Sequence, residues 1–308
     1  ALQNWVALQD SYQCIYTIVD IHALTTIETP EDIANIRPNI YEMALDWLAA
    51  GIDPDQSTIF IQSHIPEVMT LNTLLSMVTP LGWLMRVPTF KEKVRQMEQT
   101  EESVNYGLVG YPILQTADII LYKADTVPVG QDQLPHIELA REIVRRFNNR
   151  FGETFPEPQA KLTQVPLIVG LDGQQKMSKS LDNHIDLASS DEDTTKRVLT
   201  AFTDPQRTTR DTPGRPSVCN VYSLHNIFTE ESDVSTINQE CTSATRGCVD
   251  CKRQLAENLN TYLGPMRERR GELSKRPDDI KDILSQGAKT ARQIAQSTIA
   301  EVYDKMGL

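Results

Sequence analysis

Long apolar runs are missing from this sequence. No stretch of its 308 residues approaches the roughly eighteen apolar residues that a membrane-spanning helix needs. The first residues also lack the basic flank and the small-residue cleavage site of a secretory signal peptide. We therefore expect a cytoplasmic protein without a membrane partner.

The sequence also contains few cysteines and carries no net positive charge. Only five cysteines occur, and four of them fall between Cys219 and Cys251, which is unlike the disulfide framework of a small secreted protein. The net charge of −12 excludes a general nucleic-acid coat, and we expect no DNA partner. An enzyme that binds RNA through a local basic face is still compatible with an acidic total.

Short β-branched runs alternate with amphipathic helices along the first half of the chain. Residues 14–19 and 57–61 predict buried strands. Between them Pro30 marks the start of a helix whose apolar stripe stops at Gly51. This alternation predicts an α/β fold with an open, mostly parallel sheet covered by helices on both faces. His22 follows the first strand, and we interpret it as a structural hydrogen-bonding residue.

A carboxylate interrupts one strongly apolar segment. Residues 110–122 predict a turn followed by an apolar helix, in which Asp118 carries the charge. A buried charge must find a partner or a ligand, because isolated burial costs several kcal/mol. A short strand at 126–129 follows and leads to Gln133. Ligands of parallel sheets bind beyond the carboxyl ends of the strands, so we expect Tyr111, Asp118 and Gln133 to converge on a small polar ligand in an apolar pocket.

Two lysines lie three residues apart on a loop of small polar side chains. The pentapeptide Lys176-Met177-Ser178-Lys179-Ser180 follows an apolar run at 165–169, which predicts the end of a buried strand. Gly170 and Gly173 supply turn conformations, so we expect a loop hinged at its start. Such a lysine pair can close over a polyphosphate and neutralise charge that develops as a phosphate bond breaks. The alternative is an ordinary solvated surface loop.

These motifs resemble those of a known enzyme family. The pentapeptide Lys-Met-Ser-Lys-Ser is similar to the second signature of class I aminoacyl-tRNA synthetases. The strings Tyr-Pro-x-Leu-Gln-x-Ala-Asp-Ile, from Tyr111, and Val-Pro-Val-Gly-x-Asp-Gln-x-x-His, from Val127, resemble the bacterial tryptophanyl-tRNA synthetases. The resemblance runs through the whole chain. It implies a Rossmann-like catalytic domain at 1–188 that binds ATP and tryptophan, and a helical anticodon-binding domain at 189–308.

The resemblance implies an activity and its partners. Such an enzyme activates L-tryptophan with Mg-ATP to tryptophanyl-adenylate and pyrophosphate, and then transfers the aminoacyl group to tRNA-Trp. Catalysis in this family is positioning and charge stabilisation, without a covalent nucleophile. A homodimer is implied as well.

The resemblance also assigns individual side chains. Asp118 accepts the indole N–H of tryptophan, which a carboxylate can do and an aliphatic side chain cannot. The tryptophan pocket is lined by Tyr111, Asp118, Val127, Val129 and Gln133. The ATP site is formed by Gly130, Asp132, Lys176, Met177, Ser178, Lys179 and Ser180. The catalytic lysines that bind phosphate are Lys176, Lys179 and, from its Phe-Lys-Glu-Lys context, Lys93.

One family signature is missing from the sequence. No Gly-x-x-His-x-Gly-His-like turn occurs in the 308 residues, and in the family it precedes the helix that begins here at Ala1. Without that turn the adenine and the α-phosphate lose hydrogen-bond donors, and the middle of the sheet loses a strand. We interpret the sequence as an N-terminally truncated form of a longer protein and expect this form to be nearly inactive in adenylate formation.

Four cysteines in the second half have the spacing of a metal site. Cys241, Cys248 and Cys251 follow Cys219, and in a cytosolic protein this pattern favours a tetrathiolate centre. Some members of the resembled family carry a four-iron, four-sulfur cluster on a nearly identical spacing. Zinc is the alternative metal, because it also accepts four thiolates. Four unligated buried thiols are the third interpretation.

From about Val218 the pattern is helical to Leu308, and it carries a basic cluster. The cluster comprises Arg267, Arg269, Arg270, Lys275 and Arg276. It would suit contacts with tRNA phosphates, and a solvated helix face is an equally good interpretation.

Two other functions are compatible with parts of the sequence. A tyrosyl-tRNA synthetase shares the fold and the lysine loop, but the string that begins at Val127 weighs against it. A non-catalytic synthetase paralogue, binding tRNA or a protein partner, is suggested by the missing first signature. Amino-acid-dependent pyrophosphate exchange distinguishes all three.

Overall fold

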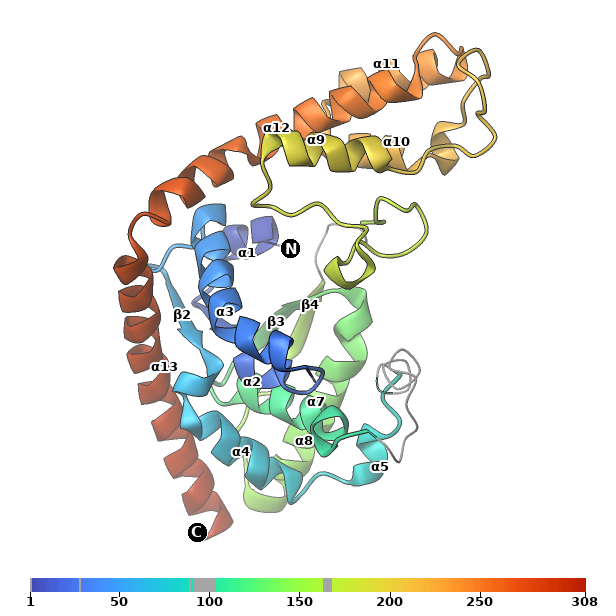
Figure 1. The fold of residues 1–308 in the computed structure, drawn as a ribbon. Coiled ribbons are helices and arrows are strands. Elements are labelled where there is room, and N and C mark those ends of the chain that lie inside the picture. Colours follow the sequence, from blue (N-terminus) through green and yellow to red (C-terminus); the bar gives the residue numbers. More distant parts are fainter. Residues whose placement is uncertain (1, 28, 89, 91–103, 163–167) are drawn as a thin grey trace. The chain divides into compact units, whose positions relative to one another are not determined.

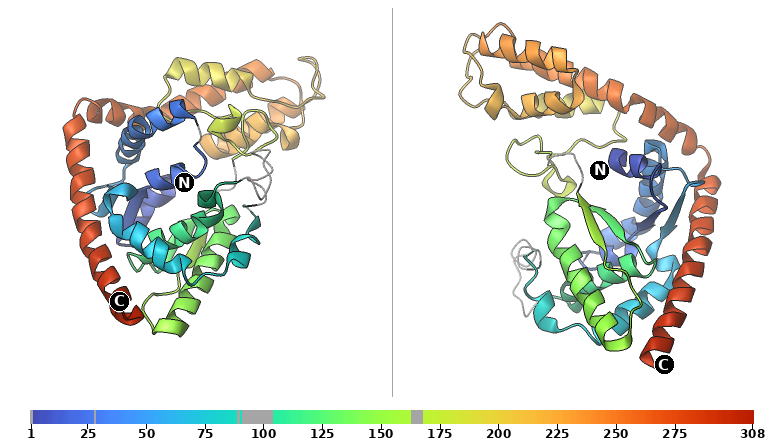
Figure 2. Two further views of the ribbon diagram at one scale, coloured as in Figure 1. Left: turned by 60° about the horizontal axis from the view of Figure 1, so that its bottom comes forward. Right: turned by 180° about the vertical axis from the view of Figure 1, so that it is seen from behind.

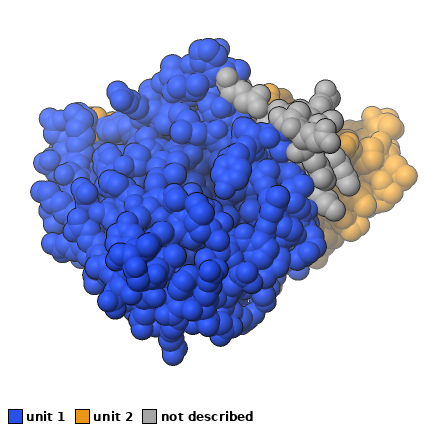
Figure 3. Space-filling model, turned by 90° about the horizontal axis from the view of Figure 1, so that it is seen from below, with its two compact units in different colours: residues 1–164, 276–308 blue, residues 165–275 orange. Residues whose placement is uncertain are grey.

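A computed structural model of the chain describes residues 2–27, 29–88, 90, 104–162 and 168–308 (Figures 1 and 2). The chain divides into two compact units, which Figure 3 colours separately. Unit 1 comprises residues 1–164 and 276–308, and unit 2 comprises residues 165–275. The predicted catalytic lysine Lys93 and part of the predicted strand, residues 165–167, lie outside the described residues.

Unit 1 has the alternating strands and helices that the sequence predicts. Its first half contains α1 (Leu2–Leu8), β1 (Cys14–Ile18), α2 (Asp20–Ala23), α3 (Pro30–Ala50), β2 (Ser57–Ile61), η1 (Gln62–His64), α4 (Pro66–Ser76) and α5 (Leu81–Leu84). Its second half contains α7 (Tyr106–Ile120), β3 (Thr126–Val129), η2 (Gln131–Gln133), α8 (Leu134–Phe151), β4 (Gln159–Leu162) and α13 (Pro277–Met306). Among the described residues, no helix is long and apolar enough to cross a membrane.

All strand pairs in the described part of unit 1 are parallel. Strand β1 pairs with β2 from Cys14 opposite Ser57 to Ile18 opposite Ile61. Strand β3 pairs with β4 from Thr126 opposite Gln159 onward. The predictions of a parallel α/β fold and of strands at 14–19, 57–61 and 126–129 are therefore confirmed.

Local sequence signals set the ends of helix α3. The Thr29 hydroxyl accepts a hydrogen bond from the backbone N–H of Asp32 at 3.1 Å, and Pro30 occupies the first turn, where no N–H is needed. Gly51 ends the helix with φ of 112°, a left-handed conformation that glycine adopts without a steric cost. Both predicted ends are confirmed.

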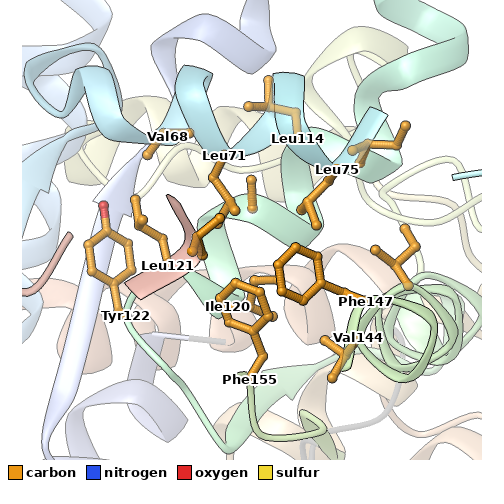
Figure 4. Packing of buried hydrophobic residues seen from close by; sticks show 14 of the residues in the cluster. Val68, Leu71, Leu75, Leu114, Ile120, Leu121, Tyr122, Val144, Phe147 and Phe155 are labelled. Carbon is orange, nitrogen blue, oxygen red and sulfur yellow. The ribbon is translucent and has the colours of Figure 1, made fainter. Parts of the chain in front are cut away.

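The core of unit 1 lies between helices α4, α7 and α8. Figure 4 shows their apolar side chains pointing toward one another, and every residue that it labels is buried. The labelled residues are Val68, Leu71, Leu75, Leu114, Ile120, Leu121, Tyr122, Val144, Phe147 and Phe155. A fully buried side chain of this size contributes about 1.5–3 kcal/mol relative to an exposed one. The core thus fixes α7, the helix that carries Tyr111 and Asp118.

The start of helix α7 differs from the prediction. The sequence predicts a turn at Gly110 before the helix, but the helix already begins at Tyr106 and includes Pro112. The reason is a cap that precedes the glycine, because the Asn105 side chain accepts a hydrogen bond from the backbone N–H of Leu108 at 2.9 Å. Tyr111 therefore lies within a helix and not at its start.

Helix α13 packs against strand β2, as the views of Figures 1 and 2 agree. Gly287 allows this close approach. A Cβ atom at Gly287 would collide with the backbone carbonyl of Ile59, which cannot move without breaking the strand. The C-terminal helix therefore belongs to unit 1, although all of unit 2 precedes it in the sequence.

Substitution of Gly287 by alanine should destabilise the protein by about 1–3 kcal/mol, because the added methyl group overpacks the contact with β2. Thermal or denaturant unfolding measures this loss. Gly271→Ala is the matched control, since Gly271 is exposed in a helix and a Cβ atom there would have no other atom within 4 Å. The control lies in the last turn of α12 and should not be destabilised, because alanine favours a helix over glycine. Equal unfolding of both variants would contradict the packing role of Gly287.

Unit 2 is helical apart from its first part. It contains η3 (Lys179–Leu181), α9 (Asp191–Thr200), η4 (Pro216–Val218), α10 (Asn220–Phe228), α11 (Glu231–Thr242) and α12 (Cys248–Leu273). Ser190 caps α9 by accepting a hydrogen bond from the backbone N–H of Asp193 at 3.0 Å. Leu171, Val198, Val221 and Leu255 are among the buried residues of its own core. The helical C-terminal region is thus confirmed, while the functional division at residue 188 stays a prediction.

Candidate active site

A network of hydrogen bonds surrounds the carboxylate of Asp118. Its side chain is only 9% exposed, and His22 Nε2 lies 2.9 Å from Oδ2. Gln62 Nε2 donates to both carboxylate oxygens, at 2.9 Å for Oδ1 and 2.7 Å for Oδ2. The expectation that this buried carboxylate needs partners is therefore confirmed.

Gln62 is a residue of the site that the sequence did not reveal. It is fully buried, and its Oε1 accepts from the backbone N–H groups of Ile21 at 3.1 Å and His22 at 3.3 Å. Its amide thus connects the start of α2 to Asp118 on α7. A buried glutamine directly after a strand was the available signal, since buried amides are rare without partners.

His22 makes a hydrogen bond of the kind that the sequence interpretation assigned to it. It lies against the carboxylate that is predicted to bind the substrate. Burial raises the pKa of Asp118, and the hydrogen bonds from His22 and Gln62 oppose this rise by stabilising the charged form. The hydrogen bonds therefore offset part of the cost of burying this carboxylate in a site largely closed to water.

Tyr111 and Asp118 lie on the same face of α7, because residues seven apart are separated by two helical turns. Tyr111 is buried, and its hydroxyl lies 3.2 Å from His136 Nε2 on α8. The two rings also pack at 5.4 Å between centroids. Helix α7 therefore presents a phenol and a carboxylate to one side, with His136 fixing the phenol.

The other predicted pocket residues of unit 1 follow one another along the chain. Val127 and Val129 lie on β3, and Gly130 begins the 3₁₀ turn η2 that contains Asp132 and Gln133. A Cβ atom at Gly130 would lie 2.6 Å from Asp132 Oδ1, so a larger residue there would displace the Asp132 carboxylate. This segment leaves the carboxyl end of a parallel strand, where α/β sheets bind ligands.

The lysine signature is part of a tight hairpin in unit 2. Val169 forms an antiparallel bridge with Lys176, and backbone hydrogen bonds join Gly170 N to Gln175 O at 2.8 Å and Met177 N to Ile168 O at 2.9 Å. The predicted strand end at 168–169 is thus one arm of this hairpin. Lys176 and Lys179 are exposed, and the backbone φ of 70° at Gly173 forms the turn.

The four spaced cysteines share one region of unit 2 and are all half-buried. Burial, with a smaller contribution from charge repulsion by the other three cysteines, raises the pKa of the Cys251 thiol to about 12. Among the residues that the structure describes, no three His, Cys, Asp or Glu side chains are placed to share one metal ion. The cysteines that are close in the sequence therefore also lie near one another in the structure. They are not arranged to bind a single metal ion.

Two features beside the thiols fit an anionic sulfur centre. Arg207 Nη1 lies 3.7 Å from Cys241 Sγ, and its buried Nε has no hydrogen-bond partner among the described residues. A Cβ atom at Gly214 would lie 2.5 Å from the same sulfur. The Arg207 guanidinium and the backbone of Gly214, which has no side chain, thus both lie beside the Cys241 sulfur.

Arg267 is not available for phosphate contacts in this structure. It is 13% exposed and donates to Asp191 Oδ1 at 2.7 Å, Thr194 Oγ1 at 2.6 Å and Asn260 Oδ1 at 2.9 Å. The guanidinium joins α12 to α9, and this use of its donors corrects the interpretation of Arg267 as part of a phosphate-binding cluster.

The chain has relatives among known families, curated sequences and solved structures. Residues 1–264 match the family described as tRNA synthetases class I (W and Y). The tryptophan–tRNA ligase of Thermotoga maritima is 42% identical over 310 residues, which cover all of this chain and 93% of that protein. The tryptophan–tRNA ligase of Aquifex aeolicus is 38% identical, with 100% and 94% of the two chains covered.

A solved structure is similar over the same extent. The tryptophanyl-tRNA synthetase from Campylobacter jejuni, complexed with ADP and tryptophan, superimposes with a TM-score of 0.88 at 36% identity. The match covers 100% of this chain and 94% of that chain.

Proposed function

Because the chain belongs to the class I tRNA synthetases of the tryptophan and tyrosine group, we infer that it is a tryptophan–tRNA ligase. The enzyme joins L-tryptophan to tRNA-Trp at the expense of ATP. In the first step the tryptophan carboxylate attacks the α-phosphorus of ATP, and pyrophosphate leaves. In the second step a terminal ribose hydroxyl of the tRNA attacks the aminoacyl carbonyl, and AMP leaves.

The observation that carries this proposal is the carboxylate network at Asp118. A buried carboxylate oriented by His22 and Gln62 presents a fixed acceptor for one N–H donor in an apolar setting. The indole of tryptophan supplies such a donor. Tyr111, Val127, Val129 and Gln133 are proposed as the remaining walls of this pocket.

The residues proposed to bind ATP form two sets in the sequence. Gly130 and Asp132 of η2 are assigned to the adenosine moiety, and Met177, Ser178 and Ser180 to the phosphates. Lys176, Lys179 and Lys93 are proposed to stabilise the charge that moves onto pyrophosphate as the bond to the α-phosphorus breaks. Magnesium enters as part of the Mg-ATP substrate.

Pyrophosphate exchange tests the function directly. The protein should incorporate labelled pyrophosphate into ATP when tryptophan is added, and not with the other amino acids. Comparable exchange with tyrosine would instead favour the tyrosyl enzyme, because a phenol hydroxyl can also donate to Asp118. Absence of exchange with every amino acid would favour a non-catalytic paralogue.

The four cysteines are proposed to hold a four-iron, four-sulfur cluster, with zinc as the alternative. A cluster is larger than a single ion, so its four thiolates need not approach within reach of one metal atom. The guanidinium of Arg207 beside Cys241 favours a negatively charged sulfur centre, and the half-buried position of all four thiols would shield it. Such a cluster would hold α10, α11 and α12 together.

Protein purified without oxygen should contain iron and show iron–sulfur absorption that Cys248→Ser removes. Cys14→Ser is the matched control, because Cys14 lies on β1 and belongs to the other unit. We expect Cys248→Ser to retain tryptophan activation and to lose tRNA affinity, since the loops around the thiols lose order. Neither iron nor zinc at stoichiometric level would contradict the proposal.

A homodimer is proposed through exposed apolar side chains of unit 1. Met77 at the end of α4, Leu81 on α5 and Tyr106 at the start of α7 are 71%, 61% and 72% exposed, and both α4 and α5 pack against α7. Large apolar side chains that are so exposed on adjoining helices are typical of protein interfaces. Sedimentation should show a dimer that Leu81→Asp converts to a monomer. Leu308→Asp, at an equally exposed apolar residue, should leave the dimer intact.

We also propose that the protein is located in the cytoplasm. It agrees with an enzyme that acts on tRNA, and cell fractionation measures it.

A further inference from the structure

We propose that Asn183 is a positioning residue that holds the lysine signature loop in its working shape. The proposal rests on the proposed function for the chemistry, and on the hydrogen bonds of unit 2 for the shape. It concerns the loop of residues 172–178 and the side chain that closes it.

The Asn183 side chain binds the loop at three points. Its Oδ1 accepts from the backbone N–H of Ser178 at 2.7 Å, and its Nδ2 donates to the backbone carbonyl of Lys176 at 3.3 Å. Nδ2 also donates to Asp172 Oδ2 at 2.7 Å. One amide group therefore fixes the backbone on both sides of Met177, between the two lysines.

Asn183 is itself firmly held. It is only 4% exposed, and its backbone carbonyl accepts from the N–H of Leu171 at 2.7 Å. Its amide lies directly over Gly170, where any Cβ atom would collide with it. The Gly170 carbonyl in turn accepts from Asn220 Nδ2 at 2.7 Å, at the start of α10. The loop is thus connected through Asn183 to the helical part of unit 2.

The Asp172 side chain also binds the loop, on the side opposite to its contact with Asn183 in the carboxylate group. Its Oδ1 accepts from the backbone N–H groups of Gln174 at 2.9 Å and Gln175 at 3.2 Å. These hydrogen bonds and the one from Asn183 lower the pKa of Asp172. The carboxylate is therefore charged near neutral pH and remains an acceptor for the Asn183 amide.

Apolar burial contributes little to the order of the loop. Gln174, Gln175, Lys176 and Lys179 are exposed, and Met177 is half-buried. A segment with so little apolar burial cannot offset the entropy cost of ordering its backbone, about 1–2 kcal/mol per residue, by the hydrophobic effect. Its shape therefore depends on hydrogen bonds, and three of these come from one side chain. Loss of that side chain should disperse the lysines over many positions, of which few act on the phosphates.

Asn183→Ala should lower the turnover number of tryptophan-dependent pyrophosphate exchange about tenfold, and leave the KM for tryptophan within about twofold. Trypsin should also cleave after Lys176 and Lys179 about tenfold faster, in the absence of substrates. Asn238→Ala is the matched control, because Asn238 lies on α11 in the same unit and contacts Tyr222 instead. The control should change neither quantity.

A rescue test swaps the residues at positions 172 and 183. Asn183→Asp places two carboxylates together, and Asp172→Asn removes the acceptor of the Asn183 amide, so each should lower turnover and speed cleavage. The double variant, with both changes, restores a carboxylate and an amide in reversed order. The carboxylate at position 183 still accepts from the backbone N–H of Ser178 but cannot donate to the Lys176 carbonyl. The double variant should therefore recover part of the turnover and of the resistance to trypsin, which a loss caused by general unfolding would not do.

The outcomes separate this inference from the function itself. Cleavage of Asn183→Ala at the unsubstituted rate, or a double variant no better than the single ones, would overturn the role of Asn183. Cleavage that changes as expected, in a protein that never exchanges pyrophosphate with tryptophan, would support the loop connection and reject the ligase function.

Discussion

Alanine in place of Lys176 or Lys179 should lower the turnover of tryptophan-dependent pyrophosphate exchange by about 10²–10³-fold, the range found when one stabilising group is removed from developing charge. Both lysines are exposed on the hairpin, so their replacement removes charge without opening a core. Each ammonium is expected to act on the pyrophosphate as it leaves, and not on tryptophan in the ground state. The KM for tryptophan should therefore stay close to that of the unsubstituted enzyme.

Lys196→Ala provides the control for this loss. Lys196 lies on α9 of the same unit, is 65% exposed and pairs with Glu192 at 2.8 Å on the surface. Removal of such a pair has little effect, so turnover should not change. Lysine variants of the signature that raise only the KM for tryptophan, with turnover intact, would show that the lysines do not act on the phosphates.

Loss of the Asp118 carboxylate should weaken tryptophan binding by about 1–3 kcal/mol, or roughly tenfold to a hundredfold in Kd. The indole N–H then enters an apolar pocket without an acceptor. Equilibrium dialysis with labelled tryptophan measures the affinity of Asp118→Ala directly. Discrimination against amino acids that lack a ring donor should fall by the same factor, because the lost hydrogen bond is what they cannot make.

Asp118→Ala also leaves the amide of Gln62 and the imidazole of His22 without their acceptor, so its stability must be measured by thermal unfolding at the same time. Asp55→Ala, in an exposed turn of the same unit, is the control for loss of an aspartate. A folded Asp118→Ala protein that binds tryptophan normally would remove Asp118 from the pocket.

The parts of the fold that depend on neighbours in sequence could be predicted. The strand at Ser57–Ile61 and the ends of α3 follow from β-branched residues, a threonine cap and a glycine, each acting within a few residues. The turn expected at Gly110 was wrong because a cap at Asn105 had already started the helix. Local signals compete, and the stronger one sets the boundary.

The partners of the site could not be predicted in the same way. A buried carboxylate at position 118 requires hydrogen-bond donors, and this much follows from physical chemistry. His22 and Gln62 are 96 and 56 residues away in the sequence, and only the tertiary fold brings α2 and η1, which carry them, to Asp118. Asn183 was missed for a similar reason, since its three contacts with the loop depend on the fold of the hairpin and not on a spacing.

The return of α13 to β2 has a consequence for biosynthesis. Unit 1 is built from two stretches of sequence, and all of unit 2 is encoded between them. During translation unit 2 therefore leaves the ribosome complete, while β2 still lacks the helix that covers it. An uncovered strand surface of this kind favours association with other nascent chains. The interval between synthesis of residue 164 and residue 306 is thus when the growing polypeptide has most need of a chaperone.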